Sequence, residues 1–330
     1  MKISVSNLYE VIIEKNSLQN LKKYLNTNIK SLVLTDDLIP EELVKSVLKQ
    51  FNNAILFVMK HGEQNKTLDT VNEIYNVLLE NEFDRKSQLI CLGGGIVGDL
   101  GGYVAATYKR GISFINIPTT TLAMIDSSVG GKVAVNFNGV KNIVGAFYNP
   151  SLVLIDETVL STLSNRHLAN GLVEELKMGL CLDHNLYQLF LKDNYLDHLD
   201  EIIYLSVNAK RKIVEIDPKE ENIRKVLNFG HTIGHGIESK YLDEIYHGEA
   251  VACGMLYVIN NKELKKEVKD VLNRLNIDVD LYNTDNILQY LKNDKKRNNQ
   301  VIDFVILENV EDYKFIPYTL EDANELLRKE

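Results

Sequence analysis

The sequence predicts an α/β N-terminal domain built on a parallel sheet, followed by an α-helical C-terminal domain. In the first half, short runs rich in apolar and β-branched residues alternate with stretches of helical periodicity. This alternation is typical of a parallel sheet covered by helices. From residue 158 on, the periodicity is helical almost throughout. We therefore expect two domains, 1–157 and 158–330.

The elements of the first domain are runs bounded by turn residues. The predicted strands are SLVLTD (31–36), AILFVM (54–59), QLICL (88–92), SFINIP (113–118) and LVLID (152–156). The predicted helices are EELVKSVLKQF (41–51), TLDTVNEIYNVLLEN (67–81) and a third that opens at the glycines from residue 93. Between the last two strands, Asn138-Gly139 is flanked by alternating residues in 132–145, which is typical of a β-hairpin.

The second domain is predicted to contain five helical segments and one hairpin. The helical segments are 166–181, 197–215, 223–239, 248–275 and 285–293, and the hairpin is VIDFVILENVEDYKFIPY (301–318). Within the fourth segment, KELKKEVKD (262–270) is typical of a solvated helix face.

Composition excludes several classes of partner. The net charge of −9 argues against a nucleic-acid or acidic-membrane surface, although a few clustered lysines can still bind a small anion. Cys91, Cys181 and Cys253 lie far apart among apolar neighbours, as reduced cysteines of a cytoplasmic protein do. The N-terminus has charges within its apolar stretch, unlike a signal peptide, and the apolar stretch 250–259 is too short to span a membrane. We therefore expect a cytoplasmic protein with a small-molecule partner.

Three histidines cluster in the second domain. His231 and His235 are four residues apart, so they share one face of a helix, and His247 follows on the next predicted helix. Catalytic zinc typically has three protein ligands and one open position, so spacing alone suggests a three-histidine zinc site. Histidine pairs at this spacing also occur as structural residues, and the sequence leaves that alternative open.

A glycine-rich loop, Gly93 to Asp99 (GGGIVGD), follows a predicted strand and opens a helix. Its G-x-G-x-x-G pattern is that of a Rossmann-like nucleotide-binding loop, whose backbone amides hold a pyrophosphate. The loop follows the third strand instead of the first, and no acidic residue ends the next strand, so a glycine-rich packing turn is the alternative. Other polar residues at or near predicted strand ends favour a ligand there. They are Asp36, Glu63, Lys66, Thr119 and Thr120.

Four motifs in series resemble the 3-dehydroquinate synthase family, the NAD- and zinc-dependent cyclases of the shikimate pathway. They are the stretch from GGGIVGDLGGY to GAFYNP (93–150), GLVEELKMGL (171–180), IRKVLNFGHTIGHGIES (223–239) and YHGEAVACGM (246–255). The match covers most of residues 60–300. The resemblance implies the fold of that family: a Rossmann-like NAD-binding domain followed by an α-helical domain. It also implies an NAD cofactor, a zinc or cobalt ion and a homodimer.

For the metal, the resemblance implies the ligands Glu174, His231 and His247, and it moves His235 to the substrate. For NAD it implies a set spread over the first domain and its end: Asp36, His61, Gly62, Glu63, Gln64, Asn65, Lys66, Gly94, Gly95, Ile96, Val97, Gly98, Asp99, Thr119, Thr120, Lys132, Lys141, Thr162 and Leu163.

For the substrate the resemblance implies ten residues, the last of them lent by a partner subunit: Asp126, Lys132, Asn142, Lys177, Lys210, Glu220, Arg224, Asn228, His235 and Arg110. Either Lys295 or Lys296 is expected to contact the phosphate. The family's substrate, 3-deoxy-D-arabino-heptulosonate 7-phosphate, carries a carboxylate and a phosphate, which suits the cations in this set. The alternative is that these cationic residues are ordinary solvated side chains on the surface.

The implied reaction has no net redox change. The C5 hydroxyl is oxidised, phosphate is eliminated, the ketone is reduced again, and ring opening with an aldol closure gives the carbocycle. Two alternatives remain: another sugar-phosphate cyclase, such as a 2-deoxy-scyllo-inosose or valiolone synthase, and a metal-dependent polyol dehydrogenase. The chain departs from the family at Ser164, where proline is common, and at His167, where an acidic residue is frequent. These departures leave the local contacts near the nicotinamide end open.

Overall fold

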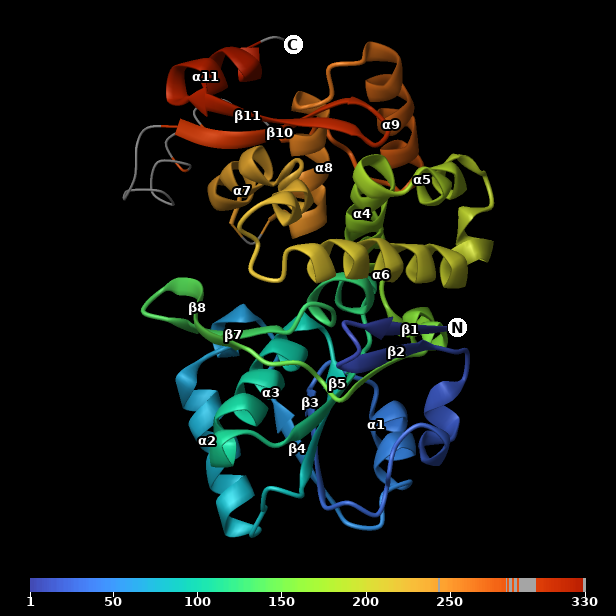
Figure 1. Ribbon diagram of the computed structural model, residues 1–330, viewed down its shortest axis with the longest axis vertical. Helices are drawn as coiled ribbons and strands as arrows, with labels where there is room; N and C mark the ends of the chain where they lie inside the picture. The colour runs from blue at the N-terminus through green and yellow to red at the C-terminus, as the bar shows by residue number, and fades with distance from the viewer. Residues whose placement is uncertain (243, 283, 285–286, 288–289, 291–300, 329–330) are drawn as a thin grey trace. The chain divides into compact units, whose positions relative to one another are not determined.

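The computed structural model describes residues 1–328 except 243, 283, 285–286, 288–289 and 291–300 (Figure 1). The chain divides into two compact units, Met1–Leu163 and Ser164–Glu330. The predicted boundary after residue 157 therefore falls inside the 3-10 helix η6 (Glu157–Thr162), which ends the first unit. No described helix is long and apolar enough to cross a membrane.

The first unit is a seven-stranded sheet in the order β1-β2-β9-β6-β5-β3-β4. Its strands are β1 (Lys2–Val5), β2 (Tyr9–Ile13), β3 (Ser31–Asp36), β4 (Ala54–Met59), β5 (Gln88–Gly93), β6 (Ser113–Pro118) and β9 (Leu152–Ile155). All neighbouring strands are parallel except β1 and β2. This confirms the predicted fold class. The β1–β2 hairpin at one edge was not predicted.

Helices α1 (Glu41–Leu48), α2 (Leu68–Glu80) and α3 (Gly95–Thr107) connect these strands. Figure 1 shows α2 and α3 together beside one face of the sheet. Alternate strand residues such as Leu32, Leu34 and Cys91 form a buried core with α2 and α3 residues such as Ile74 and Val104. The predicted hairpin is present as β7 (Lys132–Phe137) and β8 (Val140–Phe147), and Gly139 has the positive φ of 77° that its turn requires.

The second unit is mainly helical. Its helices are α4 (Asn165–Leu182), α5 (His184–Leu191), α6 (Leu199–Ile216), α7 (His231–Lys240), α8 (His247–Tyr257), α9 (Lys262–Arg274) and α11 (Leu320–Arg328). The C-terminal hairpin lies where the sequence predicts it, as β10 (Val301–Asn309) and β11 (Asp312–Thr319). The predicted helical segment 285–293 lies largely outside the described residues, as do Lys295 and Lys296.

Two predicted helices are each divided in two. The segment 223–239 consists of the 3-10 helix η8 (Ile223–Asn228) and α7, because Gly230 has a left-handed φ of 75° that interrupts the helix. The segment 248–275 breaks between α8 and α9. There Asn261 begins a new helix, since its Oδ1 accepts hydrogen bonds from the N–H groups of Glu263 and Leu264 at 3.0 and 3.2 Å.

Candidate active site

The histidine cluster lies where α7 and α8 pack tightly against each other. A Cβ atom on Gly230 would lie 2.6 Å from Met255, and one on Gly254 would lie 2.0 Å from the carbonyl oxygen of Gly230. The glycines therefore let the two backbones approach closely. As a result, the first residue of α7, His231, and the first residue of α8, His247, have ring centroids 5.2 Å apart.

A buried carboxylate faces both imidazoles. The Oε1 atom of Glu174, on α4, lies 3.6 Å from Nε2 of His231 and 3.7 Å from Nε2 of His247. Ligand atoms around a tetrahedral zinc ion with bonds near 2.0–2.1 Å are about 3.3–3.4 Å apart. The three side chains thus fit a shared metal ion. The third histidine, His235, is also near, since ligand nitrogens of the three histidines lie within 4.8 Å of one another.

The Nδ1 atoms show which ring edges face the carboxylate. His231 Nδ1 lies 3.0 Å from the carbonyl oxygen of Phe229, and His247 Nδ1 lies 3.1 Å from Oε2 of Glu238. These contacts hold the Nδ1–H on the outer edge of each ring and leave Nε2 with the lone pair that a metal ion could accept. Sequence reasoning missed Glu238. The available signal was its position seven residues after His231, which places it on the same helical face.

The environment sets opposite charge preferences on the two rings. Burial, assisted by the nearby Lys177 ammonium, lowers the pKa of His231 to about 3, so this ring stays neutral and able to ligate a metal. Burial also lowers the pKa of His247, but the hydrogen bond to Glu238 and the charge of Glu174 outweigh it, so the pKa of His247 is raised overall. Lys177 itself is buried and donates to Oε2 of Glu174 and, at 2.7 Å, to the carbonyl oxygen of Leu227.

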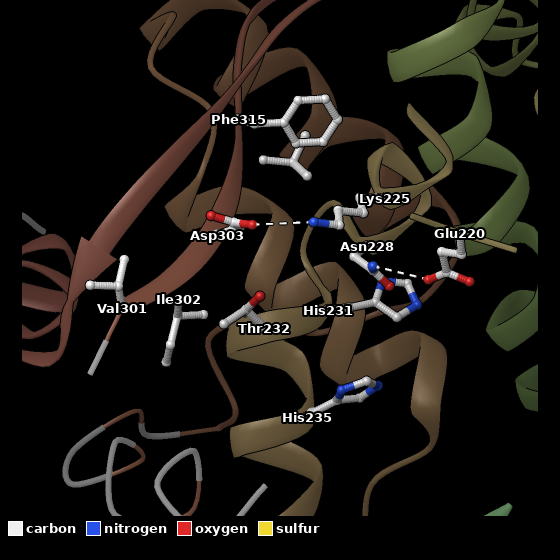
Figure 2. A pocket seen from close by; sticks show the side chains of 11 residues that line it. Glu220, Lys225, Asn228, His231, Thr232, His235, Val301, Ile302, Asp303 and Phe315 are labelled. Carbon is white, nitrogen blue, oxygen red and sulfur yellow. Dashed lines mark hydrogen bonds and ion pairs between the residues drawn. The ribbon is translucent and has the colours of Figure 1, made fainter. Parts of the chain in front are cut away.

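A pocket of about 400 Å³ opens beside these histidines. Figure 2 shows His231, His235, Asn228 and Glu220 around it, with side chains of β10 and β11 forming the opposite wall. Asn228 Nδ2 donates to Oε1 of Glu220 at 3.3 Å. Lys225 and Asp303 are 3.5 Å apart across the pocket.

The loop that carries Glu220 and Arg224 is organised by one carboxylate. Asp217 accepts hydrogen bonds from the backbone N–H groups of Glu221, Asn222 and Arg224 at 3.0, 2.7 and 3.1 Å. Arg224 is buried and donates to the carbonyl oxygen of Pro218 at 2.8 Å. Asp217 was not predicted from the sequence, because its carboxylate accepts from backbone N–H groups, and these give no residue-type pattern.

In the first unit the structure brings Lys66, Asp99 and Asn142 together. The buried Lys66 ammonium lies 2.6 Å from Asp99 Oδ2 and 2.6 Å from Asn142 Oδ1. Burial raises the pKa of Asp99, while the charge of Lys66 opposes this shift. Asn136 links the same group to Glu63, since it donates to Glu63 Oε1 at 2.8 Å and accepts from the N–H of Asn142 at 2.8 Å.

The glycine loop takes the predicted position between β5 and α3. Gly94 is the N-cap of α3, and a Cβ there would meet only the Thr120 side chain, at 3.4 Å, so the loop surface is open on that side. The following residues Gly95 to Asp99 form the first turn of the helix. Thr119 is buried, and its N–H donates to the carbonyl oxygen of Gly93 at 3.0 Å, which joins the loop to the end of β6.

Asp36 ends β3, and the next residue, Asp37, contacts His61 in the loop after β4. Asp37 Oδ1 accepts from the backbone N–H of His61 and lies 2.8 Å from its Nδ1. Gly62 follows with a φ of 97°, and the turn continues through Gln64 and Asn65. Burial raises the pKa of Asp36.

The remaining predicted residues are more scattered. In the first unit Arg110, Lys132 and Lys141 are exposed, Asp126 lies in a π-helical turn (Ala123–Ser127), and Thr162 with Leu163 ends the unit. In the second unit Lys210 is buried on α6.

The chain matches known families over most of its length. Residues 56–170 match the model described as 3-dehydroquinate synthase N-terminal, and residues 171–297 match the one described as 3-dehydroquinate synthase C-terminal. The chain belongs to the 3-dehydroquinate synthase family. A 3-dehydroquinate synthase of Clostridium botulinum is 39% identical over 92% of this chain and 93% of the relative. One of Streptococcus mutans is 36% identical over 100% of both chains.

Solved structures agree with this placement. A 2-deoxy-scyllo-inosose synthase, crystallised with carbaglucose-6-phosphate, NAD⁺ and Co²⁺, superimposes with a TM-score of 0.90 at 25% identity, covering 100% of this chain and 99% of the other. A 2-epi-5-epi-valiolone synthase of Streptomyces hygroscopicus with NAD⁺ and Zn²⁺ bound has a TM-score of 0.85 at 26% identity, covering 97% and 96%. The architecture is therefore that of the sugar-phosphate cyclases.

The two departures from the family pattern have defined positions. Ser164 is the N-cap of α4, and its Oγ accepts from the N–H of His167 at 3.3 Å, so the helix start is kept without proline. His167 stacks on Tyr246, with ring centroids 4.7 Å apart. His167 thus packs beside the residue that precedes His247.

Proposed function

We propose that the protein converts 3-deoxy-D-arabino-heptulosonate 7-phosphate into 3-dehydroquinate and phosphate, using NAD and a divalent zinc or cobalt ion. One observation carries the proposal. In a chain of this family, the Glu174 carboxylate lies 3.6 and 3.7 Å from the Nε2 atoms of two histidines and is bound from its other side by the buried Lys177. This arrangement supports a metal site with a cation beside it, as an anionic hydroxy substrate needs.

Glu174, His231 and His247 would hold the metal ion, which would act as a Lewis acid on a substrate hydroxyl. The tetrahedral spacing and the Nδ1 contacts support this set over the three-histidine set. His235 lies on the same face of α7 and lines the pocket, so it is assigned to the substrate. An imidazole at this place can pass a proton to or from a substrate hydroxyl.

The first unit would hold NAD, which supplies a hydride acceptor and later the hydride donor. The glycine loop presents backbone amides at the start of α3, suited to a pyrophosphate. Lys66 and Asp99, held together with Asn142, present a fixed polar group next to that loop. Asp36 ends β3, where an acidic residue suits ribose hydroxyls.

Three buried cations of the second unit would bind the substrate's charges. Lys177, Lys210 and Arg224 are each less than 5% exposed, which argues against the reading of solvated surface charges. Arg224 has a planar guanidinium suited to a carboxylate, and Glu220 lies 3.9 Å from its Nε. Asn228, hydrogen-bonded to Glu220, would orient a substrate hydroxyl.

The second candidate is another sugar-phosphate cyclase, favoured by the fold match with 2-deoxy-scyllo-inosose synthase. Substrates of that reaction class lack the carboxylate, so the effect of changing Arg224 or Lys210 distinguishes the two candidate functions. Arg224→Met should raise KM for a carboxylated substrate by at least tenfold. An equal loss with an uncarboxylated sugar phosphate would favour the second candidate.

The direct test incubates the protein with the heptulosonate phosphate, NAD and Zn²⁺, and measures phosphate, dehydroquinate and NADH together. We expect equal amounts of phosphate and dehydroquinate, with NADH never exceeding the enzyme. Phosphate without the cyclised product, or NADH accumulating with turnover, contradicts the proposal.

We also propose a homodimer in which Arg110 serves the partner's site. Arg110 is exposed, with a left-handed φ of 64°, and so is available to another chain. Arg110→Ala and Lys177→Ala should each be inactive. After mixing and reassociation, about a quarter of the wild-type activity should return, because half of the dimers would be mixed and each would contain one intact site. No recovery in a verified mixed dimer contradicts a contribution in trans.

A further inference from the structure

One face of α4 contacts the first turn of α8 at three successive positions. Arg166, Asn170 and Glu174 are spaced four residues apart and therefore lie along the same helical face. They meet, in order, Glu249, Gly248 and His247. The proposed metal carboxylate is thus the last of three polar contacts between the two helices.

Arg166 makes the outermost contact. Its Nε donates to Glu249 Oε1 at 2.6 Å and its second nitrogen donates to Glu249 Oε2 at 2.8 Å, a bidentate pair. The guanidinium also covers the Tyr246 ring at 4.2 Å and donates to the carbonyl oxygen of Glu244 at 2.8 Å. Glu249 Oε2 accepts from the Tyr246 N–H at 2.9 Å, so the same carboxylate caps the N-terminus of α8.

Asn170 makes the middle contact. Its Oδ1 accepts from the N–H of Gly248 at 2.5 Å. A Cβ on Gly248 would lie 2.1 Å from the carbonyl oxygen of Asn170, so only glycine permits this approach. The backbone on either side of His247 is therefore fixed against α4, while Glu238 fixes the direction of the His247 ring.

We propose that Arg166 and Asn170, acting through Glu249 and Gly248, are positioning residues that set the distance between the Glu174 carboxylate and His247. The proposal rests on the proposed metal site. Metal ligation tolerates deviations of only about 0.2 Å. Loss of either contact lets the start of α8 shift. The affinity for the metal ion should then fall roughly 10- to 100-fold, as it does when a residue that holds a metal ligand in place is removed.

The test measures Zn²⁺ affinity of the full-length metal-free protein by competition with a chromophoric chelator, for Arg166→Lys and Asn170→Ala. Lysine keeps the charge but loses the bidentate fork. Arg211→Lys is the matched control, because Arg211 pairs with Glu215 at 2.7 Å on α6, outside these contacts. The Co²⁺ absorption spectrum of each variant reports the ligand geometry, and the melting temperature without metal reports the fold.

We expect Zn²⁺ affinity to fall 10- to 100-fold and the Co²⁺ bands to shift in the Arg166 and Asn170 variants, with both unchanged in the control. Lower melting temperatures with unchanged Zn²⁺ affinity would overturn the proposal, because the contacts would then serve the fold alone. If Arg166→Lys fails to fold, Glu249→Gln, which keeps an acceptor for the Tyr246 N–H, carries the same expectation. Glu174→Gln separates the two proposals: if it retains Zn²⁺, the proposed metal site itself is wrong.

Discussion

Glu175 is a carboxyl group with no exposed surface, directly after Glu174 on α4. Among the residues that the structure describes, neither of its oxygens has a hydrogen-bond partner. Burial raises its pKa from the ordinary 4.5 to about 8, so the folded protein holds this carboxyl protonated at neutral pH. Glu175→Gln keeps the shape of the side chain and removes the ionisation.

The pH dependence follows from linkage. The unfolded chain ionises Glu175 above about pH 4.5, whereas the folded chain keeps its proton until about pH 8. Stability of the wild type is therefore lost as the pH rises through this window, and the glutamine variant does not have this loss. At 1.36 kcal/mol for each pKa unit, the variant should gain about 3 kcal/mol relative to the wild type between pH 5 and pH 8.

The assay is urea unfolding of both metal-free proteins at several pH values, with Glu42→Gln on the exposed surface of α1 as the control. We expect the difference in unfolding free energy between wild type and Glu175→Gln to change across the window, and the control to parallel the wild type. Parallel curves for Glu175→Gln and wild type would contradict a buried, protonated carboxyl, because Glu175 would then share its ionisation state with the unfolded chain.

Three further outcomes follow from single contacts. Gly254→Ala should destabilise the fold by about 1–3 kcal/mol and weaken Zn²⁺ binding, because its Cβ would lie 2.0 Å from the Gly230 carbonyl oxygen; a melting temperature equal to that of the wild type contradicts this. Lys66→Met should raise the NAD dissociation constant at least tenfold in a fluorescence titration, whereas Lys60→Met, at an exposed ion pair, should not. Glu238→Gln replaces the charged acceptor that raises the pKa of His247 with a neutral one, so protons should compete with Zn²⁺ only at lower pH than in the wild type; an unchanged pH profile of Zn²⁺ affinity would argue against that contact.

Strands β3, β4, β5, β6 and β9 of the first unit were predictable because each is a run of mainly apolar residues, whether buried on both faces, as β3 and β5 are, or at the edge of the sheet, as β4 is. The predicted strands 31–36, 54–59 and 113–118 coincide with β3, β4 and β6. The hairpin of β1 and β2 was missed because polar residues alternate with apolar ones in KISV and a charged residue interrupts YEVII, so neither strand is a continuous apolar run. The break at Gly230 was missed because glycine alone does not show that its φ is positive.

The site was predictable where its residues are local in sequence. His231 and His235 share a helical face, and spacing alone brought them together. The carboxylate that faces His231 and His247 comes from α4, and only the close packing of α4 and α8 around Gly248 places it there. The family resemblance identified Glu174. The contacts that position it against α8 could be found only in the structure.

In the proposed reaction, one substrate carbon is oxidised and then reduced within a single catalytic cycle. The most direct measurement uses heptulosonate phosphate carrying deuterium at C5, with NAD and Zn²⁺, and determines the isotope in the product by mass spectrometry. We expect dehydroquinate that retains the deuterium, with one phosphate released for each molecule formed. Product that has lost the deuterium to bulk solvent, or deuterated NADH that accumulates with turnover, would contradict it.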